Sequence, residues 1–166
     1  MEYSVVELTP DDWHRYRDIR LEALEHDPQA FGSSVAREAA FDEVKWRSRL
    51  QPYSAEHRQW AVFVEDKTGK LIASAGAYVS EDGVAEIVGV YVTEDARGQG
   101  LASVLMSELI ERIKNSNVVG TLRLSVNKEQ SAAVALYQKS GFVITGEKKE
   151  MLGGEEKVVV IMEMGL

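Results

Sequence analysis

Short runs of β-branched and aromatic residues, separated by Gly, Pro, Asp and Asn, recur along the chain. These runs predict strands at residues 3–8, 60–64, 71–79, 84–92, 121–126, 142–150 and 157–164. Elsewhere apolar residues recur with a helical period, which predicts helices at residues 9–26, 42–50, 101–113 and 131–140. No repeat, low-complexity segment or linker interrupts this order. We therefore expect one domain of the α/β (α+β) class spanning residues 1–166.

Local signals set the expected ends of several elements. Thr9 is the predicted N-cap of the first helix, which carries Trp13, Tyr16, Ile19, Arg20, Ala23 and Leu24. Residues 29–38 are expected to form a loop. Asn127 and Gln130 resemble a capping box, and Gly141 is a predicted helix end. Gly76 suggests a bulge or a close backbone approach, and the charges around Gly153-Gly154 suit two exposed edge strands.

One stretch, residues 84–113, carries the strongest functional signal. A predicted strand leads through a polar turn into Arg97-Gly98-Gln99-Gly100, and a helix with a clear apolar face follows. The first N–H groups of a helix lack internal partners and carry partial positive charge. Glycines keep side chains away from those groups. This arrangement suits a phosphate or pyrophosphate.

Two common phosphate-binding motifs do not fit this turn. A P-loop needs a lysine after its last glycine, and none follows Gly100. A dinucleotide-binding turn needs a third glycine, but the chain has Ser103 there, and the acidic residue expected about 20 positions later is absent. Arg97-x-x-Gly100-x-Ala102 remains. Alternatively, the glycines only let the helix start close to a strand.

Composition excludes several classes of protein. The chain has 166 residues, 45% of them hydrophobic, which predicts a globular protein with its own core. It contains no cysteine, which excludes disulfides, Cys-based zinc sites and thiol nucleophiles. No membrane-spanning run or signal peptide is evident, so we expect a cytoplasmic protein without membrane partners. The three histidines have no metal-ligand spacing. We therefore predict no metal site.

The formal net charge of the chain is −8. Nucleic-acid binding is therefore not expected, because phosphate contacts need clustered Lys and Arg. An acidic surface would favour a cationic substrate through steering, or it serves only solubility. A homodimer is compatible with the sequence, but nothing in the sequence argues for one.

Two motifs at the expected separation resemble the GNAT N-acetyltransferase superfamily. Arg97-x-x-Gly100-x-Ala102 is similar to its R/Q-x-x-G-x-G/A motif. The segment from Leu124 to Phe142 is similar to the family pattern L-x-V-x-x-x-N-x-x-A-x-x-L-Y-x-x-x-G-F. One departure is Gln130, where the family often has Asn; Asn127 is the candidate to make that polar contact instead. The element order matches the family over essentially the whole chain.

The resemblance implies a GNAT fold, a mixed sheet of about seven strands with about four helices, splayed between the fourth and fifth strands. Acetyl-CoA would be the cosubstrate, with its pantetheine arm between those strands and its pyrophosphate at the turn. The implied contacts to acetyl-CoA are Val90, Tyr91, Val92, Arg97, Gly98, Gln99, Gly100, Leu101, Ala102, Ser103, Asn127, Gln130, Ala132, Ala133 and Tyr137.

The resemblance also implies two catalytic roles. Tyr137 matches the family tyrosine that protonates the leaving thiolate. Without the motif, it would be interpreted as a core aromatic. Glu86 lies in a segment similar to the one that carries the base of histone acetyltransferases, and it is the candidate base. Equally, Glu86 could be a strand carboxylate paired with Arg or Lys. The Val92 N–H is the expected oxyanion donor.

The acceptor amine would approach from the first two helices and the final hairpin. Phe31, Ser33, Trp46 and the turn at Gly153 are candidates to line that side, although packing explains each of them more simply. The resulting hypothesis is an acetyl-CoA-dependent N-acetyltransferase acting on a primary amine of a small molecule, amino acid or protein in a ternary complex. The alternatives are an acyl-CoA-binding sensor or structural module without turnover, and a nucleotide-binding α/β protein.

Overall fold

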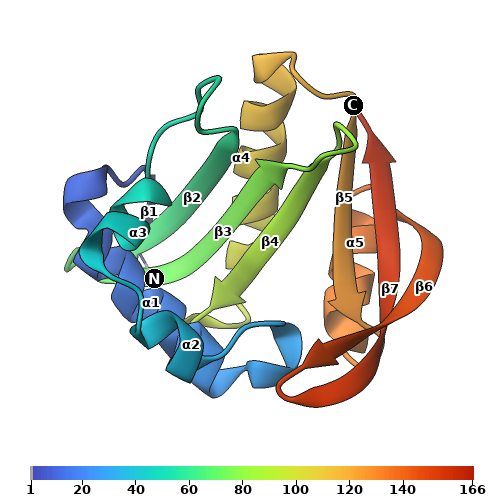
Figure 1. Cartoon of the computed structure of the whole chain (residues 1–166), viewed down its shortest axis with the longest axis horizontal. Coiled ribbons are helices and arrows are strands. Elements are labelled where there is room, and N and C mark those ends of the chain that lie inside the picture. The colour runs from blue at the N-terminus through green and yellow to red at the C-terminus, as the bar shows by residue number, and fades with distance from the viewer. Residues whose placement is uncertain (1) are drawn as a thin grey trace.

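The protein is described from a computed structural model that covers residues 2–166. Seven strands form one mixed sheet in the order β1-β2-β3-β4-β5-β7-β6 (Figure 1). The prediction of seven strands is confirmed. Their bounds are β1 Tyr3–Val6, β2 Gln59–Asp66, β3 Leu71–Val79, β4 Ala85–Val92, β5 Thr121–Asn127, β6 Val143–Leu152 and β7 Glu155–Gly165.

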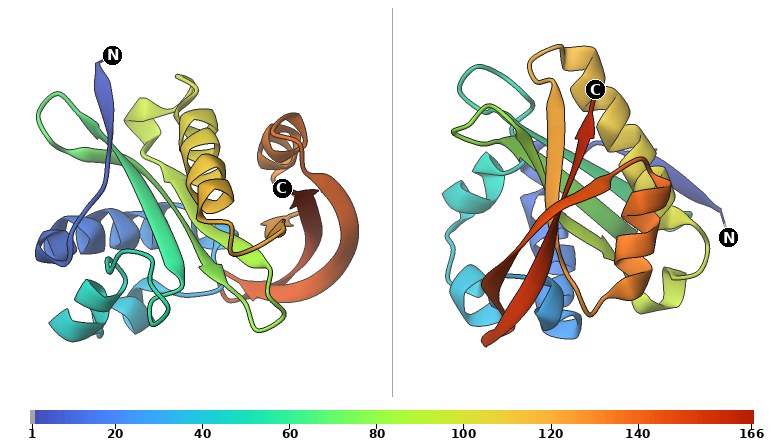
Figure 2. Two further views of the ribbon diagram at one scale, coloured as in Figure 1. Left: turned by 90° about the horizontal axis from the view of Figure 1, so that it is seen from above. Right: turned by 90° about the vertical axis from the view of Figure 1, so that its right-hand side faces the viewer.

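Five α-helices cover the two faces of this sheet. They are α1 Trp13–His26, α2 Val35–Ala39, α3 Glu43–Ser48, α4 Leu101–Ser116 and α5 Ser131–Lys139. Seen from above, α1 to α3 lie on one face, and α4 and α5 lie on the other (Figure 2). Each face has its own apolar cluster: α4 packs on one through Leu101, Leu105 and Leu109, and α1 packs on the other through Ile19 and Leu24.

The two halves of the sheet are joined only at one end. Strands β4 and β5 are parallel and pair only at Ala85↔Leu122 and Glu86↔Arg123. Beyond these residues the strands separate, and the ribbon opens between them (Figure 1). Backbone groups of β4 and β5 beyond that point therefore lack strand partners from each other. The predicted splay between the fourth and fifth strands is confirmed.

A bulge interrupts β4 shortly before the strand ends. The register with β3 steps from Ser74↔Tyr91 to Gly76↔Val88, so β4 contains one extra residue there. Gly89 supplies this bulge with a φ of +66°, in the left-handed region that favours glycine. Gly76 lies next to this irregularity, as predicted, but it pairs with Val88, and β4 supplies the extra residue.

Three local predictions were wrong. The expected loop at residues 29–38 contains most of α2, which Ser34 caps by accepting from the Arg37 N–H at 3.2 Å. The capping box at Asn127 does not form: Gln130 is the N-cap of α5, and its side chain makes no cap. Of the two strands of the final hairpin, only β6 lies at an edge of the sheet, because β7 lies between β5 and β6. The first helix also begins as a 3₁₀ turn at Pro10–Asp12.

Candidate active site

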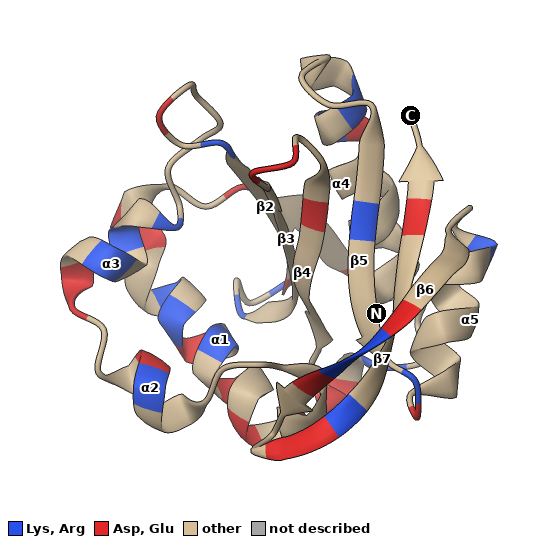
Figure 3. Ribbon diagram, turned by 45° about the vertical axis from the view of Figure 1, so that its right-hand side comes forward, with Lys and Arg blue, Asp and Glu red and all other residues tan. Residues whose placement is uncertain are grey.

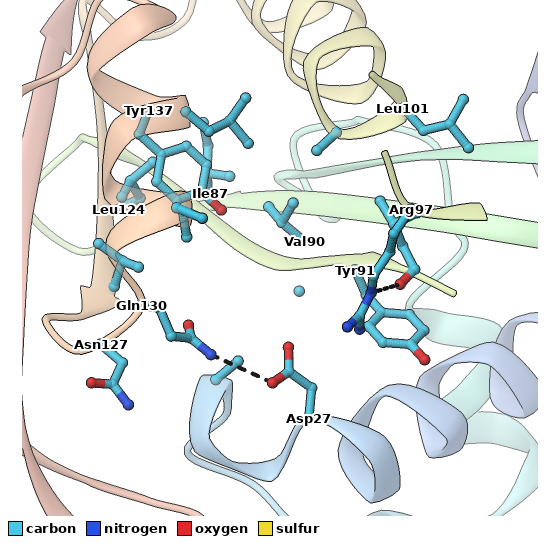
Figure 4. Close-up of a pocket in the computed structure, with 18 of the residues that line it drawn as sticks. Asp27, Ile87, Val90, Tyr91, Arg97, Leu101, Leu124, Asn127, Gln130 and Tyr137 are labelled. Atoms are coloured by element: carbon cyan, nitrogen blue, oxygen red, sulfur yellow. Dashed lines mark hydrogen bonds between the residues drawn. The ribbon is translucent and has the colours of Figure 1, made fainter. Parts of the chain in front are cut away.

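A cavity of about 630 Å³ lies where β4 and β5 part. Its walls come from both strands, from the start of α4 and from α5, and Figure 4 shows these side chains converging on one space. Every residue predicted to contact acetyl-CoA, except Gln99, lines this cavity. Segments some 45 positions apart in the chain are thus brought together, as their two motifs predicted.

The turn before α4 leaves one wall of the cavity free of side chains. Gly98 and Gly100 have φ values of +80° and +76°, and a methyl group on either glycine would meet no protein atom within 4 Å. Backbone N–H groups at the start of the 16-residue α4 are therefore accessible from the cavity. This geometry suits a pyrophosphate, with the helix dipole adding to the attraction.

The end of β4 presents backbone groups to the opening. The Thr93 N–H donates to the Ile72 carbonyl of β3 at 2.9 Å, so strand alternation directs the Val92 N–H and C=O away from β3. The Arg97 Nε donates to that Val92 carbonyl at 3.0 Å, and its guanidinium lies 5.8 Å from the Tyr91 ring (Figure 4). An amide-bearing arm between the strands would compete with Arg97 for this carbonyl.

Tyr137 projects from α5 into the cavity. Figure 4 shows its hydroxyl directed toward β4, on the side of Ile87 and Val90. The side chain is buried, and it packs edge-on against Phe142 at 6.3 Å between ring centroids. Burial raises the pKa of Tyr137 to about 12. The hydroxyl is therefore protonated at neutral pH, the form that a general acid requires.

Asn127 and Gln130 lie beside the cavity but are tied to the loop after α1. The Asn127 Nδ2 donates to the Gln29 carbonyl at 3.1 Å, and its Oδ1 accepts from the Glu129 N–H at 3.0 Å. The Gln130 Nε2 donates to Asp27 Oδ1 at 3.4 Å (Figure 4). Asp27, which sequence reasoning missed, therefore helps to form the cavity wall. No sequence signal marks it, because its contact joins residues about 100 positions apart.

Glu86 lies at the paired end of β4, away from this cavity. Its side chain is 17% exposed and forms an ion pair with Arg123 of β5, which also binds Asp82 at 2.8 Å. The hydrogen bonds to Arg123 hold the pKa of Asp82 at about 2. Glu86 is absent from the walls of the 630 Å³ cavity and of the cavity described next. The catalytic role of Glu86 stays a prediction.

A second cavity, of about 470 Å³, lies on the opposite face of the sheet under α1 and α3. Strands β2, β3 and β4 form its floor, and Tyr16, Arg20 and Arg49 contribute to its walls. Val88 and Gly89 line both cavities. The two spaces therefore meet at the β4 bulge, where a group held between the parted strands could be reached from the helix side.

A buried carboxylate organises the second cavity. The side chain of Glu38, from α2, is 1% exposed; it accepts from Arg20 Nε and Nη2 at 3.0 and 2.9 Å and from Arg49 Nη1 at 2.7 Å. Burial opposes its ionisation, but the hydrogen bonds and charges of the two arginines outweigh burial and hold its pKa at about 2. Arg20 also stacks on Phe31 at 5.0 Å, and Arg49 stacks on Phe41 at 4.9 Å.

The residues expected to line the acceptor side are distributed differently. Trp46 is 1% exposed in the core and lines neither cavity, in agreement with the simpler packing interpretation. Phe31 lines the first cavity, whereas Ser33 lines neither. The Gly153 N–H donates to the Phe31 carbonyl at 3.2 Å, so the final turn closes on the loop after α1.

The sequence model of the acetyltransferase (GNAT) family matches residues 11–142, which is most of the chain. The protein belongs to the GNAT acetyltransferase family. L-amino acid N-acetyltransferase AaaT from Escherichia coli (strain K12) is 30% identical to this GNAT protein over 112 residues, which are 66% of the chain and 68% of that relative. The resemblance drawn from the two motifs is thus confirmed.

Solved structures share the fold of this GNAT protein. The acetyltransferase of the GNAT family from Streptococcus pneumoniae superimposes with a TM-score of 0.85 at 20% identity, over 99% of this chain and all of that one. A phosphinothricin acetyltransferase from Sinorhizobium meliloti, in complex with AcCoA, gives 0.77 at 19% identity, over 100% and 89% of the two chains. At such identities the likeness shows the GNAT fold alone.

Two further observations bear on partners of this GNAT protein. Within residues 2–166, no helix has the length and apolar composition needed to cross a membrane. Among the same residues, no three His, Asp or Glu side chains cluster as metal ligands would.

Proposed function

We propose that this protein is an acetyl-CoA-dependent N-acetyltransferase that transfers an acetyl group to a primary amine by direct attack in a ternary complex. One observation carries the proposal. The strands β4 and β5 part after two paired residues, and the cavity between them meets a second cavity at the Val88–Gly89 bulge. An acetyl donor and an amine could therefore meet from opposite faces of the sheet. The Escherichia coli relative is named an L-amino acid N-acetyltransferase, so amino acids are the first acceptors to test.

Each step of the transfer has a candidate group in the chain. The amine nitrogen forms a bond to the thioester carbon, and the Val92 N–H faces the position where the oxyanion develops. The carbon–sulfur bond then breaks, and the Tyr137 hydroxyl gives its proton to the departing thiolate. The proton lost by the amine passes to a base, for which Glu86 is the predicted residue, reached through water. The Arg97–Ala102 turn would hold the pyrophosphate.

A second candidate function is an acyl-CoA-binding sensor without turnover. The ion pair of Glu86 with Arg123, and its absence from both cavity walls, favour this alternative because they leave the amine without an adjacent base. Such a sensor would keep the cofactor cavity and Tyr137 but would not release thiol.

The deciding experiment measures thiol release from acetyl-CoA against a panel of amines, followed by the mass of the product. The chain has no cysteine, so a thiol reagent reads only coenzyme A. An amine-dependent rate with a product 42 Da heavier, the mass of an acetyl group replacing hydrogen, supports the transferase. Tight binding of acetyl-CoA with no release from any amine supports the sensor.

A further inference from the structure

The second cavity is positively charged, in contrast to the protein as a whole. Three of its lining residues are cationic, namely Arg20, Lys45 and Arg49, and within residues 2–166 no Asp or Glu lines it. Figure 3 places basic residues on α1 and α3, the helices above this cavity. The formal net charge of the chain is −8, so the local charge cannot follow from overall composition.

The guanidinium of Arg20 is held so that one nitrogen faces the bulge. Its Nε and Nη2 are both occupied by Glu38, which fixes the planar group in a bidentate pair. Its Nη1 has no acceptor among the described residues, and it lies 3.5 Å from where a Cβ on Gly89 would be. A donor is thus directed at the point where the two cavities meet.

The charges around this donor are not balanced by the protein. Glu38 neutralises one of the two arginines, and Lys45 adds a further charge without a carboxylate partner in the described chain. Lys45 is exposed, and its ammonium lies 5.8 Å from the Phe41 ring. The partly desolvated cavity therefore favours an anionic group, and Arg20 Nη1 is the donor directed at it.

We propose that the acceptor is an amine that carries a carboxylate on the adjacent carbon, that is, a free α-amino acid, bound through that carboxylate by Arg20, Arg49 and Lys45. This proposal rests on the acetyltransferase function proposed above. Arg20 Nη1 lies 3.5 Å from where a Cβ on Gly89 would be, so a carboxylate that it binds would lie beside the β4 bulge, and an amine on the adjacent carbon would lie next to the opening between the strands. Peptide N-termini and polyamines lack this carboxylate.

Matched acceptors test the proposal. Each of the common L-amino acids is compared with its carboxamide and with its decarboxylated amine, using thiol release from acetyl-CoA. We expect kcat/KM to fall by about 10²-fold when the carboxylate is removed, because charge-assisted hydrogen bonds to guanidinium are lost. Carboxamides or decarboxylated amines that react as fast as the acids would overturn the proposal.

Variants locate the carboxylate site. Lys45→Gln should raise KM for the amino acid several-fold, and Arg20→Lys and Arg49→Lys should raise it further while keeping a cation beside Glu38. Arg47→Gln is the matched control, because Arg47 lies on the same helix but pairs with Asp11 and Glu43 at the surface. Equal effects of Arg47→Gln and Lys45→Gln would contradict the assignment.

A binding measurement separates this proposal from the proposed activity. Trp60 lines the cavity, so its fluorescence should report amino acids that bind without acetyl-CoA. If no amine releases thiol, the transferase function fails. Saturable quenching by an amino acid, but not by its carboxamide, would still support the carboxylate site in that case. Equal quenching by both compounds, or none by either, would overturn it.

Discussion

The buried carboxylate of Glu38 makes a prediction whose magnitude follows from the structure. Its pKa is lowered from 4.5 to about 2 in the folded protein, although burial alone would raise it. This difference corresponds to about 3 kcal/mol of folding free energy at neutral pH. Because the side chain is 1% exposed and its two arginine partners are mostly buried, solvent screens these pairs only weakly. Removing one member of a buried pair typically costs a similar amount, about 3–5 kcal/mol.

Glu38→Gln should therefore destabilise the fold by about 3 kcal/mol at pH 7. The folded-state pKa lies below the unfolded value, so the stabilisation is full at neutral pH and is lost as pH falls from about 5 through about 2. Urea unfolding followed by tryptophan fluorescence measures this loss as a midpoint about 1.5 M lower, for a slope of about 2 kcal/mol/M. The two proteins should converge in stability as the pH approaches 2.

The control for Glu38→Gln is Glu43→Gln, which removes an exposed i,i+4 pair with Arg47 on α3. Such pairs contribute about 0.3–0.5 kcal/mol. A loss in Glu38→Gln no larger than in Glu43→Gln would refute the reasoning. So would a gap between Glu38→Gln and the unmodified protein that stays constant from pH 7 to pH 3, because ionisation of Glu38 would then not be its source.

Three further predictions concern the site. Tyr137→Phe should lower kcat by about 10²-fold and leave the Kd for acetyl-CoA unchanged, and an unchanged kcat would reject the acid role. Because the pKa of Tyr137 is about 12, its ionisation should not lower the rate at any pH below about 11. Gly100→Ala should weaken acetyl-CoA binding by more than about 10-fold and cost about 1 kcal/mol of stability. Gly69→Ala, at a similar φ in the β2–β3 turn, should cost the stability alone. Isothermal titration measures the affinity of both variants for acetyl-CoA, and equal affinities would contradict the pyrophosphate site. Glu86→Gln should lower kcat by about 10²-fold. Arg123→Gln should not, although it removes the same ion pair together with the pair to Asp82. Equal losses in steady-state assays would assign Glu86 to that ion pair.

The region from β4 to α4 could be predicted because its signals are local and agree with one another. The apolar positions Leu101, Leu105, Leu109 and Ile113 recur at helical spacing, and all four are buried. Gly98 and Gly100 mark the turn, and both adopt positive φ. The two motifs that line the first cavity each lie within a single strand–turn–helix unit. Their positions along the sequence therefore nearly determine which residues meet in space.

The parts that could not be predicted depend on contacts between distant segments. The five-residue α2 is too short to show an apolar period, and it is fixed by the Ser34 cap and by burial of Glu38. Asn127 has the residue type of a cap, but its amide is used by Gln29, about 100 positions away. The bulge in β4 was indicated in the sequence only by Gly76 on the neighbouring strand β3. Which strand carries the extra residue depends on the register of the strand pair, and the sequence of one strand does not determine this register.

The charge of the second cavity shows most clearly why composition and geometry can disagree. A net charge of −8 suggested steering of a cationic substrate or simple solubility. One signal in the sequence pointed elsewhere, since Arg20 occupies a position in the apolar face of the first helix. A charged residue there must find a buried partner or line a cavity, and Arg20 does both, through Glu38 and at Gly89. Long-range steering depends on the summed charge of the protein. Selection at the reacting atoms depends on the few charged groups within about 4 Å, which in this cavity are Arg20 and its neighbours.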